Sequence, residues 1–178
     1  MKRISLHAGV SRGGGGRLRS PAVDARDLAA AAAARGFGVQ RVLIDCSAAE
    51  FVAELRVAVA DLRRGDALLL TFSGHGRESS WCFADRDLPL REICEVLALL
   101  PPRTFVVVVA DACHHEAWRA VDVRLRAEVT VIAPRETHAR DGHGKNTRSP
   151  FTAAVIRAMV AAPPSARACG GKAAHRRR

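Results

Sequence analysis

A cysteine and a histidine each follow a strongly apolar segment, where they could act as a nucleophile and its proton acceptor. His75 follows the run Ala67–Phe72 within Ser-Gly-His-Gly, and Cys113 follows the run Thr104–Ala110 within Asp-Ala-Cys-His-His. A cysteine attacks as the thiolate, so it needs a neighbour such as histidine that takes its proton. If the two apolar runs lie side by side, the pair predicts covalent acyl-transfer chemistry.

The order of apolar and helix-forming segments indicates how this pair is brought together. Strands are expected at Lys2–His7, Val39–Asp45, Ala67–Phe72, Thr104–Ala110 and Glu128–Ala133, with a short strand or hairpin arm at Trp81–Ala84. Helices are expected at Asp24–Arg35, from the capping box of Ser47 and Glu50 to about Arg64, at Leu90–Leu100 and at Phe151–Val160. Ala117–Arg126 is either a helix or a basic linker.

Strands that alternate with helices in this way predict a parallel, doubly wound α/β sheet. Ligands bind such sheets outside the carboxyl ends of the strands, and neighbouring strands lie about 5 Å apart. We therefore expect His75 and Cys113 to face one another, with backbone N–H groups of Gly76 and Cys113 forming an oxyanion hole. The alternative is a buried structural thiol at Cys113 and an ordinary loop histidine at His75.

Composition limits the other classes of function. The 178 residues favour one domain, 1–160, followed by a flexible basic tail, 161–178. The net charge of +10 raises nucleic-acid binding as an alternative, but no aromatic residues alternate with the basic ones as a stacking platform requires. No segment has the roughly 18 apolar residues of a membrane span, and no clear signal peptide follows Met1, so we expect a cytoplasmic protein.

Metal and phosphate sites are not favoured by the motifs. The five cysteines are odd in number and contain no C-x-x-C, which argues against a disulfide framework or a zinc ribbon. His114 and His115 are adjacent, and adjacent residues rarely ligate one ion, so we expect no metal site. Gly13–Gly16 lacks the lysine and hydroxyl residue of a P-loop and is interpreted as a flexible loop over the site entrance.

The two motifs together resemble those of the caspase-like clan of cysteine peptidases, in particular metacaspases and bacterial caspase homologues. In that family, Ser-Gly-His-Gly carries the catalytic histidine, and a later strand ending in Asp-x-Cys-His carries the nucleophile. Leu18–Ala25 and Ser149–Thr152 look like two further family segments, so that the resemblance covers about residues 2–160. It implies a caspase-like three-layer α/β sandwich with a mostly parallel central sheet, and a cysteine endopeptidase.

The resemblance also implies a specificity. In metacaspases, the residues that correspond to Asp24, Ser73 and Asp111 line the pocket for P1, the residue before the cleaved bond. Two carboxylates in a small pocket favour a cation, because a paired charge tolerates desolvation. We therefore expect cleavage of peptide or protein substrates after arginine or lysine.

Some features leave alternatives open. His115 stands where the family usually has serine, and the segment from Ala161 shows no strand where many relatives continue with further sheet elements. A catalytically inactive, caspase-like interaction module is therefore the alternative to an enzyme. The chemistry requires no cofactor. Calcium activation, known in many metacaspases, stays open although no dense acidic loop is present, and so does the oligomeric state.

Overall fold

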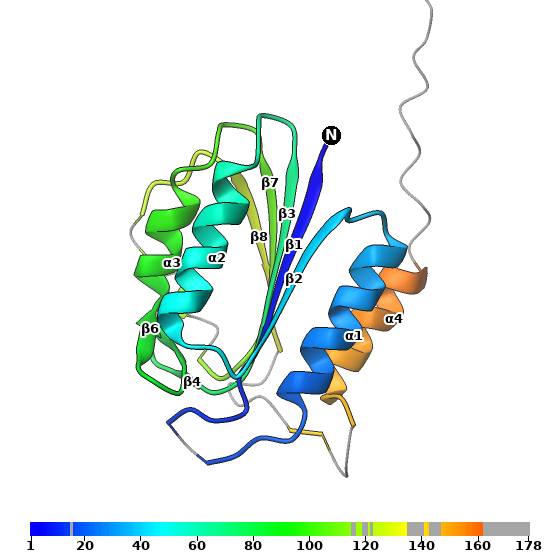
Figure 1. Ribbon diagram of the computed structural model, residues 1–178, viewed down its shortest axis with the longest axis vertical. Helices are drawn as coiled ribbons and strands as arrows, with labels where there is room; N and C mark the ends of the chain where they lie inside the picture. Colours follow the sequence, from blue (N-terminus) through cyan, green and yellow to red (C-terminus); the bar gives the residue numbers. More distant parts are fainter. Residues whose placement is uncertain are drawn as a thin grey trace, which may run out of the picture.

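The computed structural model describes residues 1–14, 16–114, 117–118, 121, 123–134, 141–142 and 147–161. Within this part of the chain, five parallel strands form the central sheet in the order β2-β1-β3-β7-β8 (Figure 1). Their bounds are Arg3–Gly9 for β1, Val39–Ile44 for β2, Ala67–Ser73 for β3, Phe105–Asp111 for β7 and Glu128–Ile132 for β8. The predicted parallel α/β sheet is thus confirmed.

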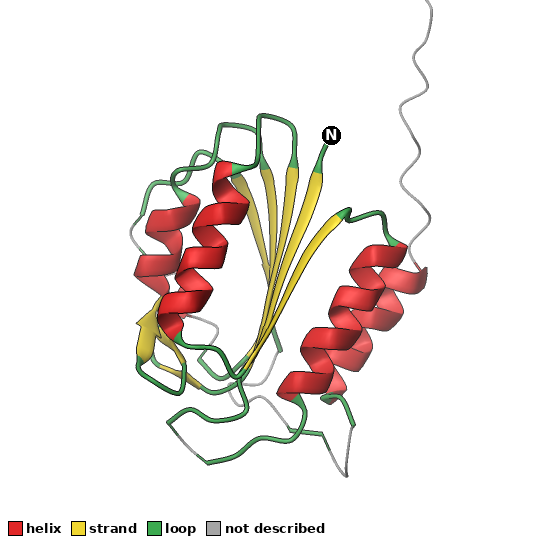
Figure 2. Cartoon of the chain, in the orientation of Figure 1, coloured by secondary structure: helices red, strands yellow, loops and turns green. Residues whose placement is uncertain are grey.

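Helices cover both faces of the sheet, which gives three layers (Figure 2). The helices are α1 at Pro21–Ala34, α2 at Ala48–Ala60, α3 at Leu90–Leu97 and α4 at Pro150–Ala161. Helices α2 and α3 lie on one face, and α1 and α4 lie side by side on the other (Figure 1). The chain leaves β1 towards β2 and returns to β3 on the other side, so the crevice of the sheet lies at the carboxyl ends of β1 and β3.

A second, small antiparallel sheet lies below α3, at the lower left of Figure 1. It consists of β4 at Gly76–Arg77, β5 at Ser80–Cys82 and β6 at Asp87–Pro89, in that order. The hairpin arm predicted at Trp81–Ala84 is its central strand. Two- and three-residue strands have no detectable period of two, which is why β4 and β6 had no signal in the sequence.

Local hydrogen bonds explain where the helices differ from prediction. Helix α1 begins three residues early because Pro21, whose φ is already helical, occupies its first turn. Helix α2 ends at Ala60 instead of near Arg64, because the Asp66 carboxylate accepts the N–H of Arg63 at 2.9 Å and folds that segment into a turn. Of the predicted Ala117–Arg126 element, residues 119, 120 and 122 lie outside the described part, and the other seven residues form no α-helix.

The two faces of the sheet bury different chemistry. The face under α2 and α3 is apolar, and there Phe72 of β3 stacks on Trp81 with ring centroids 4.3 Å apart. The face under α1 and α4 has a smaller apolar cluster around Leu69 and also buries His7 and Thr71, whose side chains bond at 2.9 Å. Further buried polar residues, Asp24 and Ser73, lie near the carboxyl end of β3, where the crevice is.

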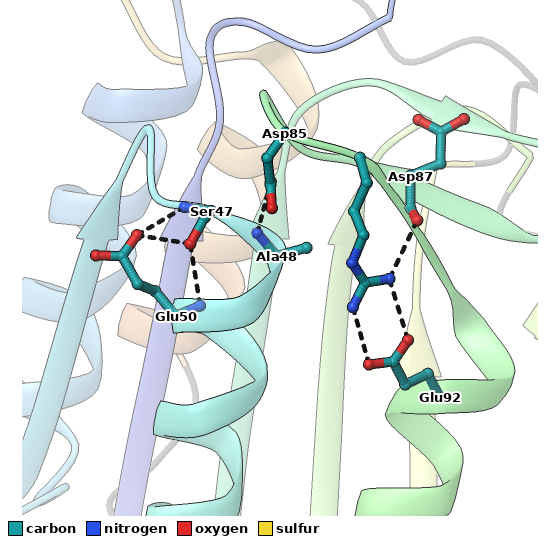
Figure 3. A network of polar contacts seen from close by, with 7 residues as sticks. Ser47, Ala48, Glu50, Asp85, Asp87 and Glu92 are labelled. Carbon is teal, nitrogen blue, oxygen red and sulfur yellow. Dashed lines mark hydrogen bonds and ion pairs between the residues drawn. The ribbon is translucent and has the colours of Figure 1, made fainter.

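Helix α2 is capped from two directions, as Figure 3 shows. The Ser47 hydroxyl accepts the Glu50 N–H at 3.1 Å, and the Glu50 carboxylate accepts the Ser47 N–H at 2.8 Å, which confirms the predicted capping box. From the turn between β5 and β6, the Asp85 carboxylate accepts the Ala48 N–H at 2.8 Å. These contacts tie the small sheet to the start of α2 (Figure 3).

We expect Ser47→Ala to lower the free energy of unfolding by about 1 kcal/mol, because it removes a cap acceptor from the first turn of α2. Urea denaturation followed by tryptophan fluorescence measures the change. Ser79→Ala, at an exposed serine, is the control and should change stability little. Equal stability of the two variants would contradict a capping role for Ser47.

None of the described helices is long and apolar enough to cross a membrane.

Candidate active site

The register of the sheet brings the two sequence motifs together. Strands β3 and β7 are parallel neighbours in which Ser73 is paired with Asp111, and the Gly74 N–H continues the ladder to the Asp111 carbonyl at 3.1 Å. His75 and Cys113 each follow two residues after this pair. Both are partly exposed, and both line one cavity of about 140 Å³. A cavity of this size is smaller than a pocket for a drug-sized ligand and suits a single side chain.

The loops that carry the two residues touch at Gly76. A β-carbon at Gly76 would lie 2.3 Å from the Cys113 carbonyl oxygen and 3.2 Å from the Cys113 nitrogen. Only glycine lets the two backbones approach so closely. Gly76 thus holds the histidine loop against the cysteine loop.

The segment after β1 fixes the orientation of the histidine ring. His75 Nε2 lies 3.0 Å from the Gly16 carbonyl oxygen, and the Arg77 guanidinium donates to the Gly14 carbonyl. Gly14 and Gly16 of the glycine-rich segment therefore contact the histidine loop. A carbonyl acceptor at Nε2 requires the proton on that nitrogen and leaves Nδ1 as the nitrogen that can serve a neighbouring thiol.

Two buried carboxyl groups lie behind this pair. Asp24 of α1 is fully buried and accepts the Ser73 hydroxyl at 2.8 Å and the Ser149 N–H at 2.9 Å, one on each oxygen. Asp111 accepts the hydroxyls of Ser149 and Thr152, both on Oδ2. Ser149, at the start of α4, thus bridges the two acids.

A third carboxylate, which the sequence did not single out, completes the cavity wall. Asp141 Oδ1 accepts the N–H groups of Ser20 at 2.8 Å, Gly142 at 3.0 Å and Arg19 at 3.1 Å. Arg19 also reaches Oδ2 at 2.9 Å. Asp141 lies 122 residues from Arg19 in the chain, so no local pattern could have revealed the contact.

This geometry, a cysteine and a histidine at the carboxyl ends of neighbouring parallel strands, agrees with the comparison with protein families, which matches residues 9–169 to the caspase domain. The chain belongs to the caspase-domain family of cysteine peptidases. Among solved structures, the domain is similar to the crystal structure of a protein from Geobacter sulfurreducens, with 21% identity and a TM-score of 0.73. The similarity covers 88% of this chain and 81% of that one, and it supports the caspase-like fold. The comparison with curated protein sequences finds no match.

The caspase domain gathers most of the residues predicted from its sequence at one cavity. The lining comprises four of them, Ser73, His75, Asp111 and Cys113, together with Leu18, Ser20, Gly74 and Asp141. Gly76 contacts the Cys113 backbone beside the cavity. Asp24 is not part of the lining and lies one hydrogen bond behind Ser73.

The three carboxyl groups of the caspase domain differ in their tendency to ionise. Burial raises the pKa of Asp24 to about 6, and the nearby Asp111 charge acts in the same direction, while hydrogen bonds from Ser149 and Ser73 oppose the shift. Burial also raises the pKa of Asp111. Burial alone would raise the pKa of Asp141 too, but the N–H groups of Arg19 and Ser20 hold it below its usual range. Asp141 is therefore the firmest negative charge of the three at neutral pH.

The buried His7 and the buried Asp24 change the pH dependence of stability in opposite directions. Burial lowers the pKa of His7 to about 4, so as the pH falls below about 6.5 the unfolded chain takes up a proton that the folded caspase domain does not, and stability is lost. Asp24, with a folded pKa of about 6 against an ordinary 3.8, acts in the reverse sense, and stability is lost as the pH rises between these values.

We therefore expect His7→Asn, whose amide can take the place of the Nδ1 atom that bonds Thr71, to remove the opposing contribution. Its unfolding free energy should fall more steeply than that of the wild type as the pH rises from about 4 to 6. Urea denaturation across this range measures both curves. Parallel curves for the two proteins would contradict a neutral, buried His7.

Within the described part of the caspase domain, no group of three or more histidine, cysteine, aspartate or glutamate residues could hold a metal ion. His115, one of the two adjacent histidines weighed as ligands, lies outside the described residues.

Proposed function

We propose that this caspase-domain protein is a cysteine endopeptidase that uses a Cys113–His75 dyad and cleaves after arginine or lysine. The observation that carries the proposal is the shared cavity, in which a cysteine, a histidine and carboxylates meet at the ends of β3 and β7. A nucleophile beside a base that is itself oriented by a third group is the arrangement that covalent catalysis requires. The Gly16 carbonyl supplies that third group.

The chemistry follows from these positions. His75 takes the proton of the Cys113 thiol, and the sulfur attacks the carbonyl carbon of the scissile bond. The C–N bond of the resulting tetrahedral intermediate breaks as the imidazolium returns the proton to the leaving amine, which leaves a thioester on Cys113. His75 then activates a water molecule that hydrolyses the thioester and regenerates the thiol.

Backbone N–H groups of Gly76 and Cys113 are our candidates for the oxyanion hole. The close approach of the two segments supports this assignment, because a β-carbon position at Gly76 lies 3.2 Å from the Cys113 nitrogen. Two N–H groups that converge on one developing charge stabilise it without reorganisation during the reaction.

The charge of the cavity supports a basic P1 residue. Among the described residues, its lining contains Asp111 and Asp141 and no lysine or arginine. Ser73 also lines the cavity, and Asp24 lies behind it and accepts the Ser73 hydroxyl. A pocket with this charge attracts a guanidinium or ammonium group and rejects an aspartate side chain, which would leave like charges facing one another.

The test is an assay with fluorogenic peptides that differ only in the P1 residue: arginine, lysine or aspartate. It is run with and without calcium, because calcium activation is open. We expect cleavage after arginine and lysine only. Cleavage after aspartate would retain the peptidase and overturn the pocket assignment. No cleavage under any condition would favour the alternative, a non-catalytic interaction module with a caspase fold.

A further inference from the structure

We propose that Asp141 is the residue that selects a cationic P1 side chain, with Asp111 beside it, and that Asp24 is a positioning residue that does not touch the substrate. The inference rests on the proposed function and reassigns the charges of its pocket. It moves the main selectivity from a residue on α1 to one in the segment before α4.

Access and bonding exclude Asp24 from direct contact with a ligand. Its side chain is fully buried and does not line the cavity. Each of its oxygens already accepts a hydrogen bond, from Ser73 Oγ and from the Ser149 N–H. Because Ser73 lines the cavity and Asp24 lies behind it, a P1 cation would have to displace this serine to reach the carboxylate. Through these two hydrogen bonds, Asp24 holds Ser73 and the start of α4 in place.

Asp141 has the properties that Asp24 lacks. It is partly exposed and lines the cavity together with Leu18 and Ser20. Three backbone N–H groups reach Oδ1 and the Arg19 N–H also reaches Oδ2, while the Ser20 side chain adds a further hydrogen bond to the carboxylate. These donors keep the group charged, and because it lines the cavity, a ligand there can reach it.

Asp111 provides the second half of the recognition. Its two hydroxyl donors, from Ser149 and Thr152, both reach Oδ2, and the Thr152 N–H adds a further hydrogen bond to the carboxylate. Two carboxylate oxygens offer about four lone-pair sites, so Asp111 keeps acceptor capacity for a ligand. Burial is the main cause that raises the pKa of Asp111, and the nearby charge of Asp141 acts in the same direction. A guanidinium or ammonium group between them would relieve this repulsion, which favours a cation over any neutral side chain.

The test separates binding from catalysis by using Cys113→Ala protein, which cannot turn over a substrate by the proposed mechanism. It is titrated with the cation 4-aminobenzamidine and with the neutral 4-aminobenzamide, and the dissociation constants are compared before and after Asp141→Asn. Asparagine keeps an oxygen for the N–H groups that reach Oδ1 and removes the charge. We expect affinity for the cation to fall about tenfold or more, and affinity for the neutral probe to change little.

Asp24→Asn in the same background is the matched control, and its amide can still pair with Ser73 and Ser149. We expect it to retain the preference for the cation even where thermal unfolding shows a stability change. Loss of the preference in Asp24→Asn, or its retention in Asp141→Asn, would overturn the assignment. Failure of both probes to bind the parent protein would also overturn it. Binding of the cation without peptide cleavage by the wild type would instead contradict the proposed peptidase activity alone.

Discussion

Cys113→Ala is expected to abolish peptide cleavage, lowering kcat/KM by at least about a thousandfold, because Cys113 is the one cysteine among the described residues that line the cavity. His75→Ala is expected to cause a loss of similar size, since the thiol would lack its proton acceptor. The two residues act as one unit, so the double variant should be no less active than Cys113→Ala. Initial rates with a P1-arginine peptide measure all three.

The matched control is Cys46→Ala, at a cysteine that lies away from the cavity. Burial raises the pKa of the Cys46 thiol to about 11, so it carries almost no thiolate at neutral pH. We expect Cys46→Ala to retain wild-type activity. Activity that survives in Cys113→Ala, or losses that add in the double variant, would contradict the dyad.

The second large effect is expected from Gly76→Ala. The new methyl group would lie 2.3 Å from the Cys113 carbonyl oxygen, which belongs to the backbone and cannot rotate away. The two loops must therefore separate, which misplaces His75 relative to Cys113. A displacement near 1 Å at reacting groups can lower the rate about a hundredfold, and we expect a loss of that order in kcat.

Gly38→Ala provides the comparison, because a β-carbon at Gly38 has no atom within 4 Å and its backbone does not require glycine. It should retain full activity. Circular dichroism of both variants distinguishes a displaced loop from an unfolded domain. Equal activity of the two glycine variants would show that the contact at Gly76 does not hold the active site together.

The fold could be predicted to the extent that it depends on local pattern. The apolar runs of β3 and β7 gave both strands to within a residue, and the Ser47 capping box gave the start of α2. The motifs at the ends of these strands then predicted the shared cavity, because parallel neighbours bring their carboxyl ends to one edge of the sheet.

The parts of the site that could not be predicted from the sequence depend on contacts between segments that are far apart in the chain. Asp141 meets Arg19 only because the segment before α4 returns to the start of α1. Ser149 was recognised as part of a family motif, but its bridge between Asp24 and Asp111 follows from the packing of α4 on α1. His7 is likewise part of an apparently ordinary strand, and its burial against Thr71 appears only in the folded sheet.

The most direct test of the account is covalent labelling with a peptide electrophile that carries arginine at P1 and reacts with an active-site thiolate. Intact-mass measurement followed by peptide mapping identifies the modified residue. We expect a single adduct on Cys113, which is absent from Cys113→Ala and from protein treated with the matching P1-aspartate reagent. Labelling at another cysteine, or on Cys113 by the aspartate reagent alone, would contradict it.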